Sequence, residues 1–341
     1  MRKSFLILTV ILTLFSCGKD NSDTETDTKD NTTENTENKQ ENQDEEFSDY
    51  KTEMRKFVIS ISQYARKKDN DFIIIPQNGQ GVVAGDEKYL EAIDGCGRED
   101  LYYGYEDDDK ATPSSDVKYM KEEIEPFIKA GKTVLVTDYT SSHIKESYEK
   151  NFQDNYLSFA APERDLNIIP EQNGYDSKYY PYNKNSDDIN KLSMAKNFLY
   201  VIGCESGDET GDNLINKLSQ TDYDVIIMDA FVYDEKPYTK AQINKLKTKK
   251  NGGKRLVISY MSIGEAENYR YYWQKNWKKG SPEFLDDENP DWNGNFKVKY
   301  WLKDWQKIIY EYTDKILASE FDGVYLDIID AFEYFESETQ D

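Results

Sequence analysis

The sequence from residue 50 onward predicts an α/β fold, a closed (β/α)8 barrel whose chain begins with a helix and ends just past a strand. Three observations predict it. Short, continuous apolar runs alternate with amphipathic stretches, as in parallel strands buried between helices. Eight such runs lie within residues 50–341, the number that closes a barrel of this kind. Short breaks containing Gly and Asn separate them. The alternative is an open, doubly wound sheet.

The predicted strands cover 72–76, 98–103, 133–138, 156–160, 198–203, 224–229, 255–261 and 323–327. The predicted helices cover 50–65, 117–129, 143–151, 188–196, 210–219, 239–248 and 301–318. Apolar residues recur at helical spacing in the first and last of these helices. Barrels of this type usually begin with a strand, so a helix-first chain predicts a rotated starting point. We expect the helix at 50–65 to pack after the strand ending at Asp327, with both ends of this domain near one rim.

The first 49 residues predict export rather than a folded domain. Residues 1–16 have a basic start and an apolar run from Phe5 to Phe15 that is too short to span a bilayer, which is typical of a signal peptide. Leu14-Phe15-Ser16-Cys17 resembles a bacterial lipobox, which predicts lipidation of Cys17; the alternative is an ordinary signal and a chance cysteine. Residues 17–49 are acidic, with Phe47 as their one large apolar side chain, and predict a disordered tether.

These features predict a secreted protein attached to the bacterial membrane through a lipid alone. Gly18-Lys19-Asp20 resembles surface-export signals of some lipoproteins, which adds the cell surface as a candidate location. The rest of the chain, residues 50–341, is expected to form one domain and a monomer.

The composition excludes several function classes. There are 43 Lys and Arg against 66 Asp and Glu, a net charge of −23, which argues against nucleic acid because phosphate binding needs clustered cations. One histidine and three scattered cysteines cannot build a multi-histidine zinc site or a disulfide framework. We therefore expect no metal and no cofactor. Cys96 and Cys204 are predicted to be buried free thiols.

Polar residues end or follow most of the predicted strands, and the strand around Gly97 carries Glu99. Ligands bind at the C-terminal ends of the strands in such barrels, so these residues are candidates for a site. They are Gln77, Asn78, Glu99, Asp138, Asp229, Glu265 and Asp327. A single carboxylate at the end of a strand is most simply a solvent-exposed residue without a catalytic role. Five carboxylates at such positions favour a site, because repulsion between like charges separates the pKa values of an acid and a base.

Glycoside hydrolysis is the reaction that best uses two carboxylates without histidine or a phosphate cradle. One protonates the leaving oxygen, and the other attacks or activates water. All five tryptophans lie between Trp273 and Trp305, and exposed rings could stack on sugars. We expect Trp301 and Trp305 in a helix core and the other three in more open positions.

Two segments carry a resemblance to glycoside hydrolase family 114, the endo-α-1,4-polygalactosaminidase group of TIM-barrel hydrolases. They are Val257-Ile-Ser-Tyr-Met-Ser-Ile-Gly-Glu-Ala-Glu267 and Phe321-Asp-Gly-Val-Tyr-Leu-Asp-Ile-Ile-Asp-Ala-Phe332. The N-terminal half resembles the later part of that family, in Ile75-Pro-Gln-Asn-Gly79, Ile93-Asp-Gly-Cys-Gly-Arg-Glu-Asp-Leu-Tyr-Tyr-Gly104 and Ala130-Gly-Lys-Thr-Val-Leu-Val-Thr-Asp-Tyr139. The halves are swapped relative to the family order, so the resemblance implies a circularly permuted member.

The resemblance implies Asp327 as nucleophile and Glu99 as general acid/base. It implies a groove lined by Asp229, Glu265, Asp330, Tyr260, Gln77 and Asn78, to which we add Asp138 from its strand end. It also implies a galactosamine- or galactose-containing polysaccharide as substrate, and the acidity of the chain suits a cationic amino-sugar polymer. A second hypothesis is a lipoprotein of the same fold that binds glycan without cleaving it.

Overall fold

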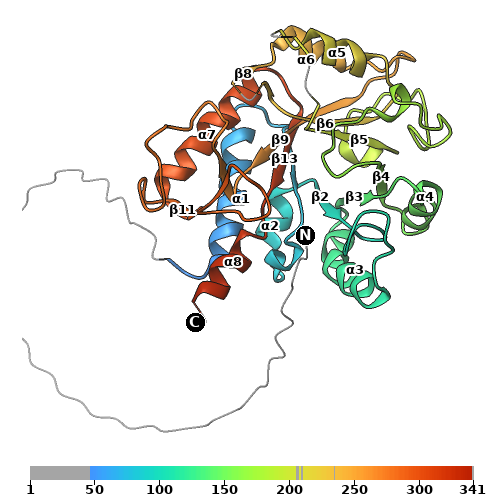
Figure 1. Ribbon diagram of the computed structural model, residues 1–341. Helices are drawn as coiled ribbons and strands as arrows, with labels where there is room; N and C mark the ends of the chain where they lie inside the picture. The colour runs from blue at the N-terminus through green and yellow to red at the C-terminus, as the bar shows by residue number, and fades with distance from the viewer. Residues whose placement is uncertain (1–46, 205–206, 209, 234, 340–341) are drawn as a thin grey trace, which may run out of the picture. The chain divides into compact units, whose positions relative to one another are not determined.

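The computed structural model describes residues 47–204, 207–208, 210–233 and 235–339 (Figure 1). The predicted signal peptide, Cys17 and nearly all of the predicted tether lie outside these described residues. Among the residues described, no helix is both long enough and apolar enough to cross a membrane.

The fold is mixed α/β and is built on parallel strands. They are β1 (Ile73–Pro76), β2 (Gly95–Glu99), β3 (Thr133–Tyr139), β4 (Leu157–Ala161), β5 (Phe198–Val201), β6 (Val225–Met228), β9 (Leu256–Ser262) and β13 (Gly323–Asp327). One sheet has the order β1-β13-β9-β6-β5, and a second has the order β2-β3-β4. Strand β13, near the C-terminus, lies between β1 and β9 with both pairings parallel.

The two sheets meet at both of their edges. At one junction Gln77 forms a parallel bridge with Gly97, and the backbone N–H of Asn78 donates to the Gly97 carbonyl at 2.9 Å. At the other junction β4 packs against β5. Residues 73–99 run from β1, an edge strand of the first sheet, to β2, an edge strand of the second.

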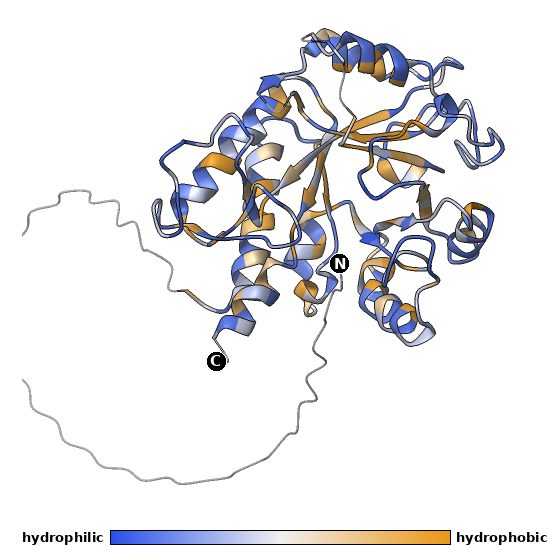
Figure 2. Ribbon diagram, in the orientation of Figure 1, coloured by the Kyte–Doolittle hydropathy of each residue, from blue (hydrophilic) through white to orange (hydrophobic). Residues whose placement is uncertain are grey.

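The helices are α1 (Tyr50–Arg66), α2 (Glu87–Ala92), α3 (Ser114–Lys129), α4 (Ile144–Gln153), α5 (Asp212–Ser219), α6 (Lys240–Leu246), α7 (Lys303–Ala318) and α8 (Ala331–Glu338). Figure 2 shows the strands as mostly hydrophobic and the outer helices as amphipathic. Helix α1 packs against both α7 and α8. Rings from the two ends of the domain meet there: the Tyr50 centroid lies 5.2 Å from Trp301 and 5.6 Å from Phe335.

Two predicted elements are wrong. The strand predicted at 98–103 is β2, which lies earlier, at Gly95–Glu99, because its glycines fit where side chains do not: a Cβ on Gly97 would overlap the Tyr325 ring. The helix predicted at 188–196 is only a short 3-10 turn, Leu192–Met194. Backbone bonds from Ile189 to the Lys254 carbonyl and from Lys196 to the Asp224 carboxylate hold that segment extended.

A small antiparallel sheet follows β9 and was not predicted. It consists of β10 (Glu265–Glu267), β11 (Leu285–Glu288) and β12 (Asn295–Val298).

The five tryptophans differ in burial. Trp305 is fully buried and donates its indole N–H to the Ile263 carbonyl at 2.8 Å, while Trp301 is half-buried beside Tyr50. Trp273 and Trp277 are half-buried against one another, and Trp292 is exposed. A further hairpin joins β7 (Phe231–Val232) to β8 (Lys236–Pro237).

Both remaining cysteines are free thiols, as predicted. Cys96 on β2 is buried, whereas Cys204 is only half-buried, so the prediction of two buried thiols holds for one of them. Burial raises the pKa of both thiols, that of Cys204 to about 11.

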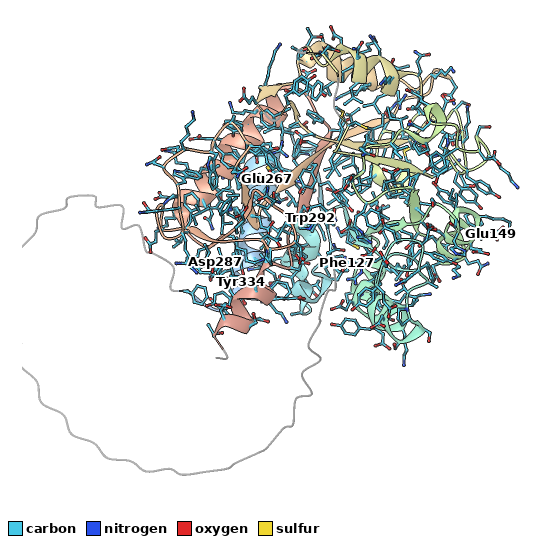
Figure 3. The ribbon with its side chains drawn as sticks, in the orientation of Figure 1. Phe127, Glu149, Glu267, Asp287, Trp292 and Tyr334 are labelled. Atoms are coloured by element: carbon cyan, nitrogen blue, oxygen red, sulfur yellow. The ribbon has the colours of Figure 1, made fainter. Side chains whose placement is uncertain are left out.

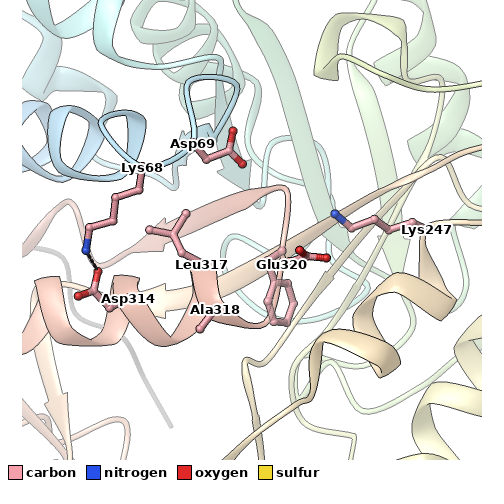
Figure 4. Close-up of a pocket in the computed structure, with 8 residues that line it drawn as sticks. Lys68, Asp69, Lys247, Asp314, Leu317, Ala318 and Glu320 are labelled. Carbon is pink, nitrogen blue, oxygen red and sulfur yellow. Dashed lines mark hydrogen bonds and ion pairs between the residues drawn. The ribbon is translucent and has the colours of Figure 1, made fainter.

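A hollow of about 530 Å³ lies at the starts of the strands (Figure 4). Its lining includes Lys68 and Asp69 before β1, Lys247 before β9 and Phe321 before β13. Lys68 is paired with Asp314, and Lys247 forms an ion pair of 2.7 Å with Asp322. The hollow therefore lies at the opposite strand ends from the carboxylates that the sequence singles out.

Candidate active site

Asp327 is the last residue of β13 and remains partly exposed. Tyr260 of β9 donates its hydroxyl to Asp327 Oδ2 at 2.8 Å, and the Ile328 N–H donates to Oδ1 at 2.8 Å. These two donors fix the orientation of the carboxyl group.

Glu99 ends β2 in the same way and is also partly exposed. The Asn78 amide donates to Glu99 Oε2 at 2.8 Å, the Glu99 N–H donates to Asn78 Oδ1 at 3.0 Å, and the Tyr139 hydroxyl donates to Oε1. Asn78 thus binds both the backbone and the side chain of Glu99 and sets its position.

The backbone is left-handed next to the ends of three strands. Asn78 has φ +56°, Asp100 has φ +60° and Ile328 has φ +61°. Non-glycine residues avoid this region, and the β-branched Ile328 does so most strongly, at a cost of about 1–3 kcal/mol each. Such conformations persist where the surrounding structure over-determines them, and here they turn the chain sharply beside Asp327 and Glu99.

The two carboxyl groups are electrostatically coupled. Burial raises the pKa of Asp327 well above its usual range, and the charge of Glu99 raises it further. Burial and the charge of Glu99 likewise raise the pKa of Asp330 to about 6. Like charges in a confined site disfavour full ionisation, so Glu99 opposes the ionisation of both Asp327 and Asp330.

Tyrosines fill the space beneath the two carboxylates. The Tyr200 hydroxyl donates to Gln77 Oε1 at 3.0 Å, and the rings of Tyr200 and Tyr325 lie 5.2 Å apart. Burial raises the pKa of Tyr200, Tyr260 and Tyr325 well above 10, so these phenols remain protonated donors. Gln77 is only 2% exposed, so it belongs to this interior layer and does not line a groove as predicted.

Asp229 follows β6 and is neutralised by a residue that the sequence analysis missed. Arg270, which is buried, forms ion pairs of 2.7 Å with Asp229 and 2.6 Å with Glu267. Asp229, a predicted substrate-binding residue, is therefore paired with a buried guanidinium, and its own carboxylate remains partly exposed. Its partner, Arg270, lies 41 positions away in the sequence, so no local pattern identifies it.

Glu265 is buried rather than open to a ligand. Its side chain accepts from the Asn289 amide at 2.8 Å and the Asn295 amide at 3.3 Å, and Lys297 lies 3.6 Å away. Each partner belongs to the segment that carries β11 and β12. Glu265 therefore holds the small sheet rather than forming an open groove wall.

Asp138 is not part of the rim, contrary to the prediction. It is fully buried and accepts from the Ser147 hydroxyl at 2.6 Å, the Asn151 amide at 2.9 Å and the Tyr102 N–H at 2.8 Å. Ser147 and Asn151 belong to α4, so the side chain points into the helix layer. Side chains alternate along a strand, so Asp138 faces away from the side used by Tyr139, which reaches Glu99.

Asp330 caps α8 and lies within the electrostatic reach of Glu99 and Glu265. The structure thus brings together Asp327, Glu99, Asp330, Tyr260 and Asn78, and it adds Tyr139. Among the described residues, no group of three or more His, Cys, Asp or Glu side chains could hold a metal ion.

Comparison with known proteins gives a family match over part of the chain. Residues 183–341 match the glycoside-hydrolase family GH114. An uncharacterised protein of Methanocaldococcus jannaschii is 40% identical over 45% of this chain and 42% of its own length. One of Deinococcus radiodurans is 41% identical over 36% of this chain and 38% of its own length.

The matches therefore span less than half the length of these curated relatives. Among solved structures, Aspergillus fumigatus Ega3 in complex with galactosamine is 24% identical, with a TM-score of 0.26, over 33% of this chain and 39% of that chain. The similarity to glycoside-hydrolase family GH114 thus covers residues 183–341, slightly less than half of this chain.

Proposed function

We propose that this protein is a glycoside hydrolase that cleaves a galactosamine- or galactose-containing polysaccharide, with Asp327 as nucleophile and Glu99 as general acid/base. The observation that carries the proposal is the coupled pair of partly exposed carboxyl groups at the ends of β13 and β2. Each has its own set of donors, so the two sit in different environments, which is how a site separates an acid from a base.

The proposed reaction needs one proton on the pair. Glu99 in its acid form protonates the glycosidic oxygen, and the Asp327 carboxylate attacks the anomeric carbon to form a glycosyl–enzyme ester. Glu99, now ionised, then takes a proton from the water that hydrolyses this ester. The two donors to Asp327, Tyr260 and the Ile328 N–H, stabilise its ionised form.

In the free protein, burial and the charge of Glu99 raise the pKa of Asp327 and so oppose ionisation of the nucleophile. An ammonium group beside the pair would lower the pKa of Asp327 again, because a nearby positive charge favours the carboxylate. A cationic amino-sugar polymer would therefore prepare the nucleophile as it binds. The net charge of −23 would also attract such a polymer.

The test is reducing-end release from a panel of polysaccharides that includes partly deacetylated galactosamine polymers. We expect the wild type to release ends and both Asp327→Asn and Glu99→Gln to lose about 10³-fold or more. Asp314→Asn, a carboxylate change at the opposite strand ends, is the matched control and should retain wild-type activity. Equal activity of all four proteins would contradict the catalytic assignment. Binding without release by the wild type would support the glycan-binding alternative.

We propose in addition that the eight parallel strands form one closed, circularly permuted (β/α)8 barrel. The Gln77–Gly97 bridge and the packing of β4 on β5 support closure, and the parallel pairing of β1 with β13 supports the permutation. A linear family model can align with only one of two swapped halves, and the match covers residues 183–341. A crystal structure in which β1 does not pair with β13 would overturn this arrangement.

We also propose that Cys17 is lipidated and that the domain is carried outside the cytoplasm on the acidic tether. The lipobox-like Leu14-Phe15-Ser16-Cys17 supports this. In the native bacterium, the wild type should partition into the detergent phase and Cys17→Ser into the aqueous phase. Detergent partitioning of both proteins would contradict lipid anchoring at Cys17.

A further inference from the structure

Two exposed aromatic residues belong to the segment that forms the small sheet after β9. Tyr269 is 41% exposed and Trp292 is 49% exposed. Both contact Asn295: the Tyr269 hydroxyl lies 3.4 Å from Asn295 Oδ1, and the Asn295 backbone N–H donates to the Trp292 carbonyl at 3.1 Å. An exposed indole presents a large apolar face that a ligand could cover.

The segment that presents Trp292 is a closed turn between β11 and β12. The Asn289 N–H donates to the Asn295 carbonyl at 2.7 Å, and the Trp292 N–H donates to the Asn289 carbonyl at 3.3 Å. The Gly294 N–H donates to Glu288 Oε1 at 2.8 Å, with Gly294 at φ +90°. The indole is thus carried by a turn whose backbone bonds are made, so little ordering entropy is left to lose on binding.

The buried carboxylate of Glu265 holds this turn through two hydrogen bonds. It accepts from Asn289 at one end of the turn and from Asn295 at the other, at 2.8 and 3.3 Å. It is only 1% exposed. A buried carboxylate that clamps both ends of one exposed turn has a positioning role, because its oxygens are already occupied by protein donors.

The clamp adjoins the carboxylate pair. A Cβ placed on Gly264 would overlap the Ile328 carbonyl and lie 2.8 Å from the Ala331 Cβ, so Gly264-Glu265 packs directly on the chain that leaves Asp327. The charge of Glu265 also contributes to the raised pKa of Asp330. Figure 3 labels Trp292 together with Glu267, which lies on β10 of the same small sheet.

We propose that Trp292, with Tyr269, which also contacts Asn295, forms a stacking subsite for one amino-sugar ring of the polymer, and that Glu265 positions this subsite through Asn289 and Asn295. This inference rests on the proposed function. A pyranose ring presents an apolar C–H face to an indole, and an ammonium group on that sugar is attracted to the ring face, for which Trp is the best aromatic partner. The subsite adds binding away from the bond that breaks, so it acts mainly on substrate affinity.

The experiment compares steady-state kinetics on long and short galactosamine oligomers. For long oligomers, Trp292→Ala should raise KM about tenfold with kcat within about twofold, and Trp292→Phe should recover most of the affinity. For the shortest cleaved oligomer, which cannot reach the subsite, the Trp292→Ala change should have little effect. Tyr119→Ala is the matched control, because Tyr119 is a 60% exposed aromatic on α3 and should keep wild-type kinetics.

The positioning role has its own test. Asn289→Ala and Glu265→Ala should each raise KM on long oligomers, and neither should add to the effect of Trp292→Ala in a double variant. Asn289→Ala removes one clamp bond without leaving a buried charge, so it remains informative if Glu265→Ala does not fold. Additive effects in both double variants would overturn the positioning role.

Failure of this inference can be told apart from failure of the proposed function. If Asp327→Asn is inactive while Trp292→Ala keeps the wild-type KM on long oligomers, the subsite is wrong and the function stands. If Asp327→Asn is as active as the wild type, the catalytic assignment is wrong, and binding decides the subsite: long oligomers should quench the tryptophan fluorescence of the wild type more than that of Trp292→Phe. Equal quenching, or no binding, would overturn the subsite.

Discussion

Glu99→Gln is expected to lose about 10³-fold of the wild-type rate on the polymer yet remain within about tenfold of it on an aryl glycoside whose leaving group departs without a proton. The reason is that a general acid is needed only where the leaving oxygen is basic. The rate of this variant should still fall as the pH is lowered, since Asp327, whose pKa is raised, must ionise to attack.

Asp327→Asn is the counterpart of this variant. It should lose activity on the polymer and on the aryl glycoside alike, because no leaving group replaces a missing nucleophile. Rates on both substrates would be measured across the pH range for both variants. If Asp327→Asn keeps the aryl glycoside activity and Glu99→Gln loses it, the two roles are exchanged.

Arg270→Met is expected to lower the free energy of unfolding by about 3–5 kcal/mol, which would lower Tm by roughly 5–15 °C for a domain of this size. Arg270 has a side chain only 3% exposed and pairs with Asp229 and Glu267. Removal of the guanidinium leaves two buried carboxylates without a counter-charge. The loss should shrink as pH falls, because the carboxylates then accept protons.

The matched control is Lys279→Met. Lys279 also pairs with two carboxylates, Asp286 and Asp287, but its side chain is 59% exposed. Exposed ion pairs contribute about 0–1 kcal/mol, so this variant should unfold near the wild-type temperature. Thermal unfolding of both variants would be followed by circular dichroism. Similar Tm values for Arg270→Met and Lys279→Met would contradict the proposed cost of the unpaired carboxylates.

The strands that the sequence analysis placed best are those with continuous apolar runs. Ile73–Pro76, Val225–Met228 and Gly323–Asp327 lie within the predicted ranges, because burial on both faces leaves a short run of mostly apolar residues. Strand β2 was misplaced because Gly95 and Gly97 carry no such signal. Their role is to leave space for Tyr325, which is 228 positions from Gly97 and cannot be inferred locally.

The sequence also predicted some residues of the site correctly and others wrongly. Asp327 was found because it ends a predicted strand, whereas Glu99 lay near the start of the strand predicted at 98–103 and its role was implied by the family resemblance; the structure places it at the end of β2. Asp138 satisfied the same rule and failed, because its carboxylate points into the helix layer toward Ser147 and Asn151. Strand position determines which rim a residue is near, but side-chain direction depends on the register of the strand within the folded sheet.

By itself, the sequence determined the α/β class, most of the strands, the acidic character of the chain and the two candidate catalytic carboxylates. The class, the strands and the charge depend on residue type and short-range periodicity, which are local, and the two carboxylates were singled out by the family resemblance. Only the tertiary structure decided that Glu265 clamps a turn, that Arg270 neutralises Asp229, and that Gln77 lies beneath the site. Each of these depends on contacts between residues far apart in the chain, where burial and charge pairing are set by the packing of the whole domain.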